Sequence, residues 1–219
     1  MNLGQKIYNW LEDRLGVKSS LTGWLRSPVA PTWTNWLYCF GGLTFLVLLL
    51  QLLSGIYLAM FYQPAPAGAW TSIEFIEKSV WLGKFCRSLH RWGAFVMMFF
   101  LIIHVLRVIY HGAYRAPREL NWICGVLLLL LAAAFVVTGY LLPWDFRAYW
   151  TVKTIGNWIE QLPLFGDTLK WLLFTDTPNG IVPVGRWFFI HTLVLPLLTG
   201  VFLAGHFLMV RRHGVTRPM

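Results

Sequence analysis

The sequence predicts an all-α membrane protein, in which four transmembrane helices form a bundle behind an N-terminal amphipathic surface helix. Hydrophobic residues make up 57% of the 219-residue chain and charged residues only 12%, about half the share usual in soluble proteins. Three charge-free stretches approach the roughly 20 residues needed to cross a bilayer, and a fourth has an apolar centre between arginines. We expect residues 1–219 to form a single domain.

The elements follow from local pattern. Ile7, Trp10 and Leu11 recur at helical spacing beside charged residues, which predicts an amphipathic helix over about residues 3–16. A solvated N-terminal cap explains that pattern nearly as well. The second span is the least regular, because arginines and histidines interrupt its apolar run WGAFVMMFFLIIHVL. The four spans are expected at about residues 33–62, 82–111, 119–142 and 185–211.

Charge predicts the orientation of the spans. Four crossings place both termini on one side of the membrane, which then holds ten basic and three acidic residues against eight and six on the other side. The positive-inside rule therefore places both termini on the negative side, cytoplasmic or stromal, of a multi-pass membrane protein. The net charge of +9 is explained by topology, so we expect no nucleic-acid partner.

Four histidines lie in the spans in two regularly spaced pairs. His90 and His104 stand at positions i and i+14 of the second span, and His191 and His206 at i and i+15 of the fourth. Fourteen helical residues rise about 21 Å, too far for one zinc or two-metal cluster but suited to two stacked haems, each bound by one histidine from each helix. The two spans run in the same direction, which pairs His90 with His191 and His104 with His206. An interhelical hydrogen bond explains any single one of them equally well.

Glycines and arginines extend this pattern. Glycines recur at i and i+14 in the first and third spans, where a residue without Cβ lets a porphyrin edge approach, although helix packing alone also favours small residues. Gly41 and Gly125 are expected beside the haem of His104 and His206, and Gly55 and Gly139 beside that of His90 and His191. Arg87 and Arg91 flank His90 and are expected to meet haem propionates; Arg118 and Arg186 are weaker candidates. Arginines at span ends usually reach the headgroups, which is the expectation for Arg107, Arg115, Arg211 and Arg212.

Seven segments carry a family resemblance along almost the whole chain. They are YCFGG at 38–42, RSLHRW at 87–92, HVLRV at 104–108, PREL at 117–120, VTGYLLPWD at 137–145, HTLVLPLLT at 191–199 and HFLMVRRHG at 206–214. With these segments the sequence resembles the cytochrome b6 family, the N-terminal four-helix haem subunits of cytochrome b6f and menaquinol-oxidising cytochrome bc-type complexes. A histidine spacing of i to i+15 in the last helix is typical of this branch, whereas mitochondrial-type cytochrome b has i to i+14.

The resemblance implies particular cofactors. It assigns His90 and His191 to a low-potential b haem on the positive side, and His104 and His206 to a high-potential b haem on the negative side. It also implies a third haem, of c type, attached to Cys39 through a single thioether, with Arg211 nearby. Cys86 and Cys124 are expected to be packing residues, and no CxxC or CxxCH spacing is present.

The resemblance further implies a redox subunit that is inactive alone, within a quinol:cytochrome c (or plastocyanin) oxidoreductase. Electrons would pass from a positive-side quinol through both haems to a negative-side quinone site, contributing to proton motive force. Implied partners are a three-helix, subunit IV-like companion, a Rieske iron–sulfur protein, a c-type cytochrome, lipid and a second copy of the complex, in a bacterial plasma membrane or thylakoid. One wall of the quinol site would comprise Gly139, Tyr140, Leu142 and Pro143.

Two other functions remain open at this stage. One is a diheme b-type membrane anchor of a dehydrogenase or hydrogenase, which the LPWD segment and the setting of Cys39 disfavour. The other is a haem-free channel or transporter that uses its histidines as a proton relay. The chain departs from its relatives in having no acidic residue between Asp13 and Glu74, where they carry candidates for proton delivery.

Overall fold

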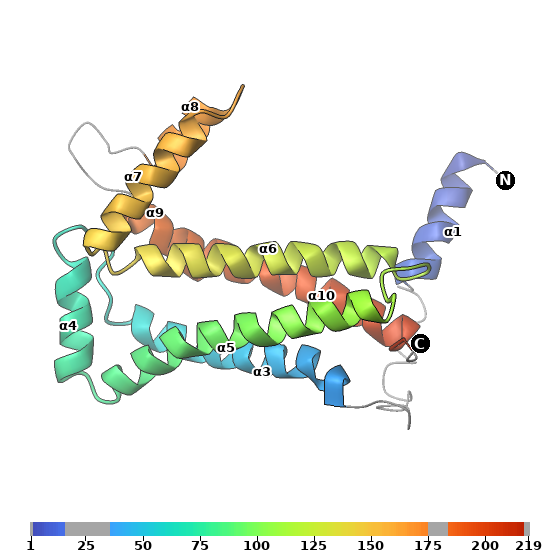
Figure 1. Cartoon of the computed structure of the whole chain (residues 1–219), viewed down its shortest axis with the longest axis horizontal. Coiled ribbons are helices and arrows are strands. Elements are labelled where there is room, and N and C mark those ends of the chain that lie inside the picture. Colours follow the sequence, from blue (N-terminus) through green and yellow to red (C-terminus); the bar gives the residue numbers. More distant parts are fainter. Residues whose placement is uncertain (1, 16–35, 175–183, 217–219) are drawn as a thin grey trace. The chain divides into compact units, whose positions relative to one another are not determined.

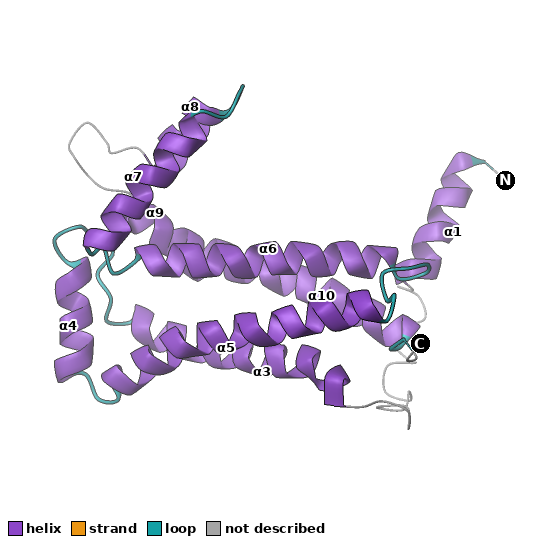
Figure 2. Ribbon diagram, viewed as in Figure 1, coloured by secondary structure: helices purple, strands orange, loops and turns teal. Residues whose placement is uncertain are grey.

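The computed structural model describes residues 2–15, 36–174 and 184–216, and the regular structure in these residues is entirely helical (Figures 1 and 2). Four segments are long and apolar enough to cross a membrane, so the predicted all-α, four-span fold class is confirmed. The start of the expected first span, residues 33–35, and residue 16 of the N-terminal helix lie outside the described residues. The four segments are Trp36–Ala59, Gly83–Tyr110, Glu119–Leu141 and Val184–His213.

The first three spans consist of α-helices, the first of them preceded by a short 3-10 turn. The first comprises a short 3-10 turn, η1 (Trp36–Cys39), and α3 (Phe40–Ala59); the second and third are single helices, α5 (Gly83–Tyr110) and α6 (Glu119–Leu141). Leucine, valine and phenylalanine are the commonest apolar residues in them, and apolar side chains cover most of their surface, as expected of helices in contact with lipid. Their few hydroxyl side chains donate to the carbonyl four residues earlier, which satisfies these groups without water; Thr44, Ser54 and Thr138 are examples.

The fourth span is not a uniform α-helix. It begins as α9 (Val184–Phe189), passes through a π-helical turn, η2 (Ile190–Val194), and continues as α10 (Leu195–His213). A π turn holds about one residue more than an α turn. The turn contains His191 and accommodates the one residue by which the histidine spacing in this span exceeds that in the second.

Shorter helices occupy the connections. α1 (Leu3–Leu15) lies near the N-terminus, α4 (Ala69–Ser79) joins the first two spans, and α7 (Phe146–Glu160) and α8 (Gly166–Phe174) follow the third. The Asp145 carboxylate caps α7 by accepting a 2.8 Å hydrogen bond from the Ala148 amide. Behind this cap lies an apolar cluster that joins the end of α6 to α7 and α9: Leu141, Ala148, Val152 and Trp187.

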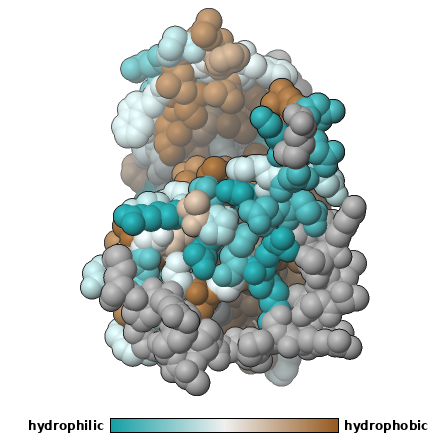
Figure 3. Space-filling view, turned by 90° about the vertical axis from the view of Figure 1, so that its right-hand side faces the viewer, coloured by the Kyte–Doolittle hydropathy of each residue, from teal (hydrophilic) through white to brown (hydrophobic). Residues whose placement is uncertain are grey.

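The chain divides into two compact units, and every span contributes residues to both. The terminal unit comprises residues 1–46, 96–131 and 198–219; the loop unit comprises residues 47–95 and 132–197. In the terminal unit, hydrophilic residues gather on the face shown in Figure 3. The Arg14 guanidinium lies 3.6 Å from the Glu119 carboxylate there, and Arg212 Nε donates to the Asp13 carbonyl over 2.8 Å.

Candidate functional site

In the loop unit, the imidazoles of His90 and His191 face each other. Their ring centroids are 6.2 Å apart and the rings are inclined by 70°. A glycine from a neighbouring helix lies against each ring: a Cβ placed on Gly55 would lie 3.1 Å from His90 Cε1, and one on Gly139 would lie 2.8 Å from His191 Cε1. A Cβ at Gly139 would therefore overlap the ring of His191, and one at Gly55 would make an unusually tight contact with His90.

The terminal unit contains a second pair with nearly the same geometry. The rings of His104 and His206 are 6.4 Å apart and inclined by 77°. A Cβ on Gly41 would lie 3.0 Å from His104 Cε1, and one on Gly125 would lie 3.5 Å from His206 Cε1. The structure thus brings the four histidines and four glycines into two groups, each of two histidines and two glycines.

The ring separations fit two imidazoles that bind opposite sides of one metal ion. A metal–imidazole bond is about 2 Å long and the ring centre lies about 1 Å further on, so two trans imidazoles have centroids roughly 6 Å apart. Among the described residues no group of three or more histidine, cysteine, aspartate or glutamate side chains is placed to hold a metal. Paired histidines flanked by glycines therefore fit a planar cofactor with two axial ligands, such as haem.

Two hydroxyl residues that the sequence analysis missed complete the loop-unit pair. Ser54 Oγ lies 2.9 Å from His90 Nδ1, and Thr138 Oγ1 lies 2.8 Å from His191 Nδ1. Both residues are buried and directly precede the glycine that faces the same histidine. The signal was present in the sequence, as the dipeptides Ser-Gly and Thr-Gly at the spaced glycines.

A second contact that the sequence did not predict, between Gln51 and Gly93, lies one helical turn before Gly55. The Gln51 side chain is buried, and a Cβ on Gly93 would lie 2.1 Å from its Nε2. Gly93 therefore provides the space that this amide occupies between α3 and α5.

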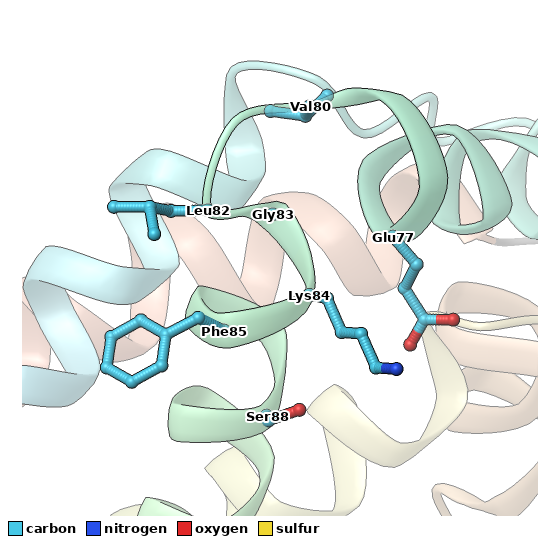
Figure 4. Close-up of a pocket in the computed structure, with 7 residues that line it drawn as sticks. All are labelled: Glu77, Val80, Leu82, Gly83, Lys84, Phe85 and Ser88. Atoms are coloured by element: carbon cyan, nitrogen blue, oxygen red, sulfur yellow. The ribbon is translucent and has the colours of Figure 1, made fainter.

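The arginines differ in their surroundings. Arg87 donates to the Glu77 carboxylate of α4 in an ion pair, while Arg91 is exposed. Glu77 also lines a surface hollow, into which the Lys84 side chain extends beside Ser88 (Figure 4). The structure thus pairs Arg87 with Glu77, a partner that the position of Arg87 close to His90 in the sequence did not predict.

Arg107 contradicts the expectation that it reaches the headgroups. It is only 9% exposed, and its guanidinium carbon lies 3.7 Å from the centroid of the Tyr38 ring. The Tyr38 hydroxyl donates to the Thr216 carbonyl over 2.8 Å, and His111 is buried with its Nδ1 3.0 Å from the Arg107 carbonyl. A cation over an aromatic face is favourable away from water, which explains why this arginine turns inward.

The other basic candidates lie elsewhere. Arg118 donates to the His213 carbonyl over 2.9 Å, and Arg211 is half-buried near the end of α10. Arg186, the weaker candidate before His191, donates to the carbonyls of Trp171 and Leu172 in α8.

The three cysteines have different environments. Cys39 is exposed at the end of η1 and Cys86 is half-buried. Cys124 is buried, and its thiol donates to the Phe202 carbonyl of α10 over 3.1 Å. The exposed thiol of Cys39 is thus accessible from outside the described chain.

The residues expected at the quinol site lie at the end of α6 and just beyond it. Gly139 faces His191, Tyr140 is 49% exposed, and the Leu142 carbonyl, next to Pro143, accepts a hydrogen bond from the Tyr62 hydroxyl. Tyr62 also stacks on Phe188, with ring centroids 5.3 Å apart. Burial raises the pKa of Tyr62 above its ordinary value, so this phenol remains protonated and continues to donate.

Comparison with known proteins identifies the family. The family described as Cytochrome b/b6/petB matches residues 25–214. Cytochrome b6 of Auxenochlorella protothecoides and that of Porphyra purpurea are each 40% identical to this chain over 98% of its length and 99% of theirs. A chain of a hyperthermophilic respiratory Complex III superposes with a TM-score of 0.76 at 30% identity; the match covers 96% of this chain and 56% of that one. Two histidine pairs between four apolar helices are thus accompanied by similarity along nearly the whole sequence, and the chain belongs to the cytochrome b/b6 family.

Proposed function

We propose that this chain is the transmembrane electron-transfer subunit of a cytochrome bc-type quinol oxidoreductase, with one b haem between His90 and His191 and another between His104 and His206. The observation that carries the proposal is the pair of imidazole separations, 6.2 Å and 6.4 Å, each with two glycines against the rings. Family membership supports the same cofactor.

The residues of the chain have defined tasks in this function. The four imidazoles would hold the haem irons, the four glycines would leave room for the planar groups, and the apolar helices would keep water from them. Each bound haem supplies the ability to accept and release one electron. Fourteen helical residues correspond to about 21 Å, which gives the chain two such sites in series along its spans.

The positive-side quinol site is proposed at the end of α6, with Gly139, Tyr140, Leu142 and Pro143 forming one wall. The Tyr62 hydrogen bond to the Leu142 carbonyl supports this placement because it holds that wall in position. The other wall would come from a three-helix companion subunit, and a Rieske protein and a c-type cytochrome would accept electrons. The assembly would be dimeric and embedded in lipid, with the termini on the negative side.

A third haem is proposed on Cys39. The support from the structure is that this thiol is exposed, whereas Cys124 is buried and bonded within the bundle. A covalent thioether requires an accessible sulfur, so Cys39 meets that condition. The basic residues Arg211 and Arg118 would then lie in the same unit as the attached group.

The complex purified from its native membrane tests these proposals. We expect a reduced-minus-oxidised spectrum of b type with two non-covalent haems per chain. We also expect haem staining of this chain's band in a denaturing gel, which Cys39→Ala abolishes. Two b haems without a stained band would remove the third haem alone; no haem absorbance at all would overturn the electron-transfer function in favour of a channel. An intact complex that lacks a Rieske partner and does not oxidise quinol would support the diheme anchor instead.

A further inference from the structure

The two hydroxyls beside His90 and His191 have a determined hydrogen-bond direction. Ser54 Oγ lies 2.7 Å from the Leu50 carbonyl, and Thr138 Oγ1 lies 2.7 Å from the Ala134 carbonyl. A carbonyl can only accept, and a hydroxyl has a single proton to donate. A hydroxyl that donates to its carbonyl is therefore left as an acceptor for the imidazole beside it.

This arrangement matches the tautomer that binds a metal through Nε2, in which the ring proton is on Nδ1. In that tautomer His90 and His191 donate to the hydroxyls over 2.9 Å and 2.8 Å. The hydroxyls thus favour the ligating tautomer and orient the ring about the Cβ–Cγ bond.

The other histidine pair lacks this arrangement. The residues that precede its two glycines are Phe40 and Cys124, neither of which is a hydroxyl residue. The Cys124 thiol donates to the Phe202 carbonyl. His206 Nδ1 is buried, and the described residues provide it with the backbone of Asn121 rather than with a hydroxyl side chain.

We propose that Ser54 and Thr138 are positioning residues that lower the midpoint potential of the haem between His90 and His191, and of that haem only. The proposal rests on the proposed function, since it requires haem at this pair. An Nδ1–H that donates to an acceptor makes the opposite nitrogen a more basic ligand. A more basic ligand stabilises the oxidised iron relative to the reduced iron, which lowers the midpoint potential.

Redox potentiometry of the intact complex tests the proposal, with haem content measured on the same samples. Ser54→Ala and Thr138→Val should each raise the midpoint potential of one haem, and the double variant should raise it further, with two b haems retained. Ser54→Thr and Thr138→Ser keep the hydroxyl and should restore the wild-type value. Thr44→Val is the matched control, because that hydroxyl also donates four residues back, to Phe40, without contacting an imidazole.

The outcomes separate this proposal from the one on which it rests. A double variant that keeps both haems at unchanged potentials overturns it, as does an equal shift of both potentials. If the double variant does not assemble, the two single variants and their conservative counterparts decide in the same way. Wild-type complex without haem would instead contradict the proposed function. The His191→Ala variant shows which redox transition belongs to this haem, because that transition should be absent from it.

Discussion

Two imidazoles face each other in each unit at nearly the same distance, but their neighbours differ. In the loop unit each histidine has a hydroxyl partner at Nδ1, supplied by Ser54 and Thr138. In the terminal unit Phe40 and Cys124 occupy the corresponding positions before the glycines, and His206 meets the backbone of Asn121 instead of a hydroxyl. Identical imidazoles can therefore be differentiated by residues one contact further away.

The two units also differ in how each one stabilises an arginine. The terminal unit buries Arg107 against the face of Tyr38, whereas the loop unit pairs Arg87 with the carboxylate of Glu77. An aromatic face stabilises a cation without adding a negative charge. Tyr38 consequently leaves the positive charge of Arg107 in place, whereas Glu77 neutralises that of Arg87.

Replacing one ligand should have the largest effect. We expect His191→Ala to lower the b haem content from two per chain to one and to leave the pair in the terminal unit loaded, because the two sites share no ligand. His206→Ala should remove the other haem. Pyridine haemochrome quantification of the purified complex measures both, and loss of both haems in either variant would contradict the independence of the sites.

The glycines should respond according to the space each one has. Gly139→Ala would place a Cβ 2.8 Å from His191 and should cost about 1–3 kcal/mol through overpacking, with reduced haem content. Gly125→Ala would place one at 3.5 Å, an ordinary contact with His206, so its loss of stability and of haem should be smaller than that of Gly139→Ala.

Thermal unfolding and haem content of both variants test this difference. Gly200→Ala is the matched control, because a Cβ there would meet nothing within 4 Å. Equal losses of stability and haem in Gly139→Ala and Gly125→Ala would show that the distance from the added Cβ to the histidine does not determine the effect.

Removal of the aromatic partner of Arg107 should have a moderate effect. Tyr38→Leu leaves the buried guanidinium without the ring and should destabilise the protein by about 1–3 kcal/mol. Tyr38→Phe keeps the ring and loses the hydrogen bond to Thr216, so about 0.5–1.5 kcal/mol is expected. Arg115→Met, at an exposed residue, should change stability by less than about 0.5 kcal/mol in the same unfolding assay. A larger loss for Tyr38→Phe than for Tyr38→Leu would exclude the ring as the partner that matters.

The smallest effect is expected from supplying the missing hydroxyl. Cys124→Thr places a hydroxyl before Gly125, where Thr138 stands in the loop unit, and should lower the midpoint potential of the haem between His104 and His206. Cys124→Val, of the same shape without a hydroxyl, is the control. Potentiometry of both variants measures the shift; an equal change in the two would attribute it to packing.

The sequence predicted the fold because span length and hydropathy are direct consequences of bilayer thickness. It predicted which histidines and glycines lie together because helical rise and rotation relate positions i and i+14 in the same way on every regular span. The Nδ1 partners of His90 and His191 escaped prediction, because a serine or threonine in an apolar helix is usually satisfied by its own backbone. Arg107 escaped for a different reason: its orientation depends on Tyr38, which belongs to another span and is distant in the sequence.

The π-helical turn at Ile190–Val194 also affects how this chain can vary in length. An insertion in a membrane helix normally rotates every following residue by about 100°. A wide turn absorbs the added residue where it occurs, and α10 continues as an ordinary helix from Leu195. The one-residue difference in histidine spacing between the second and fourth spans can thus be confined to a single turn. Redesign of the fourth span by shortening therefore has a natural point of deletion.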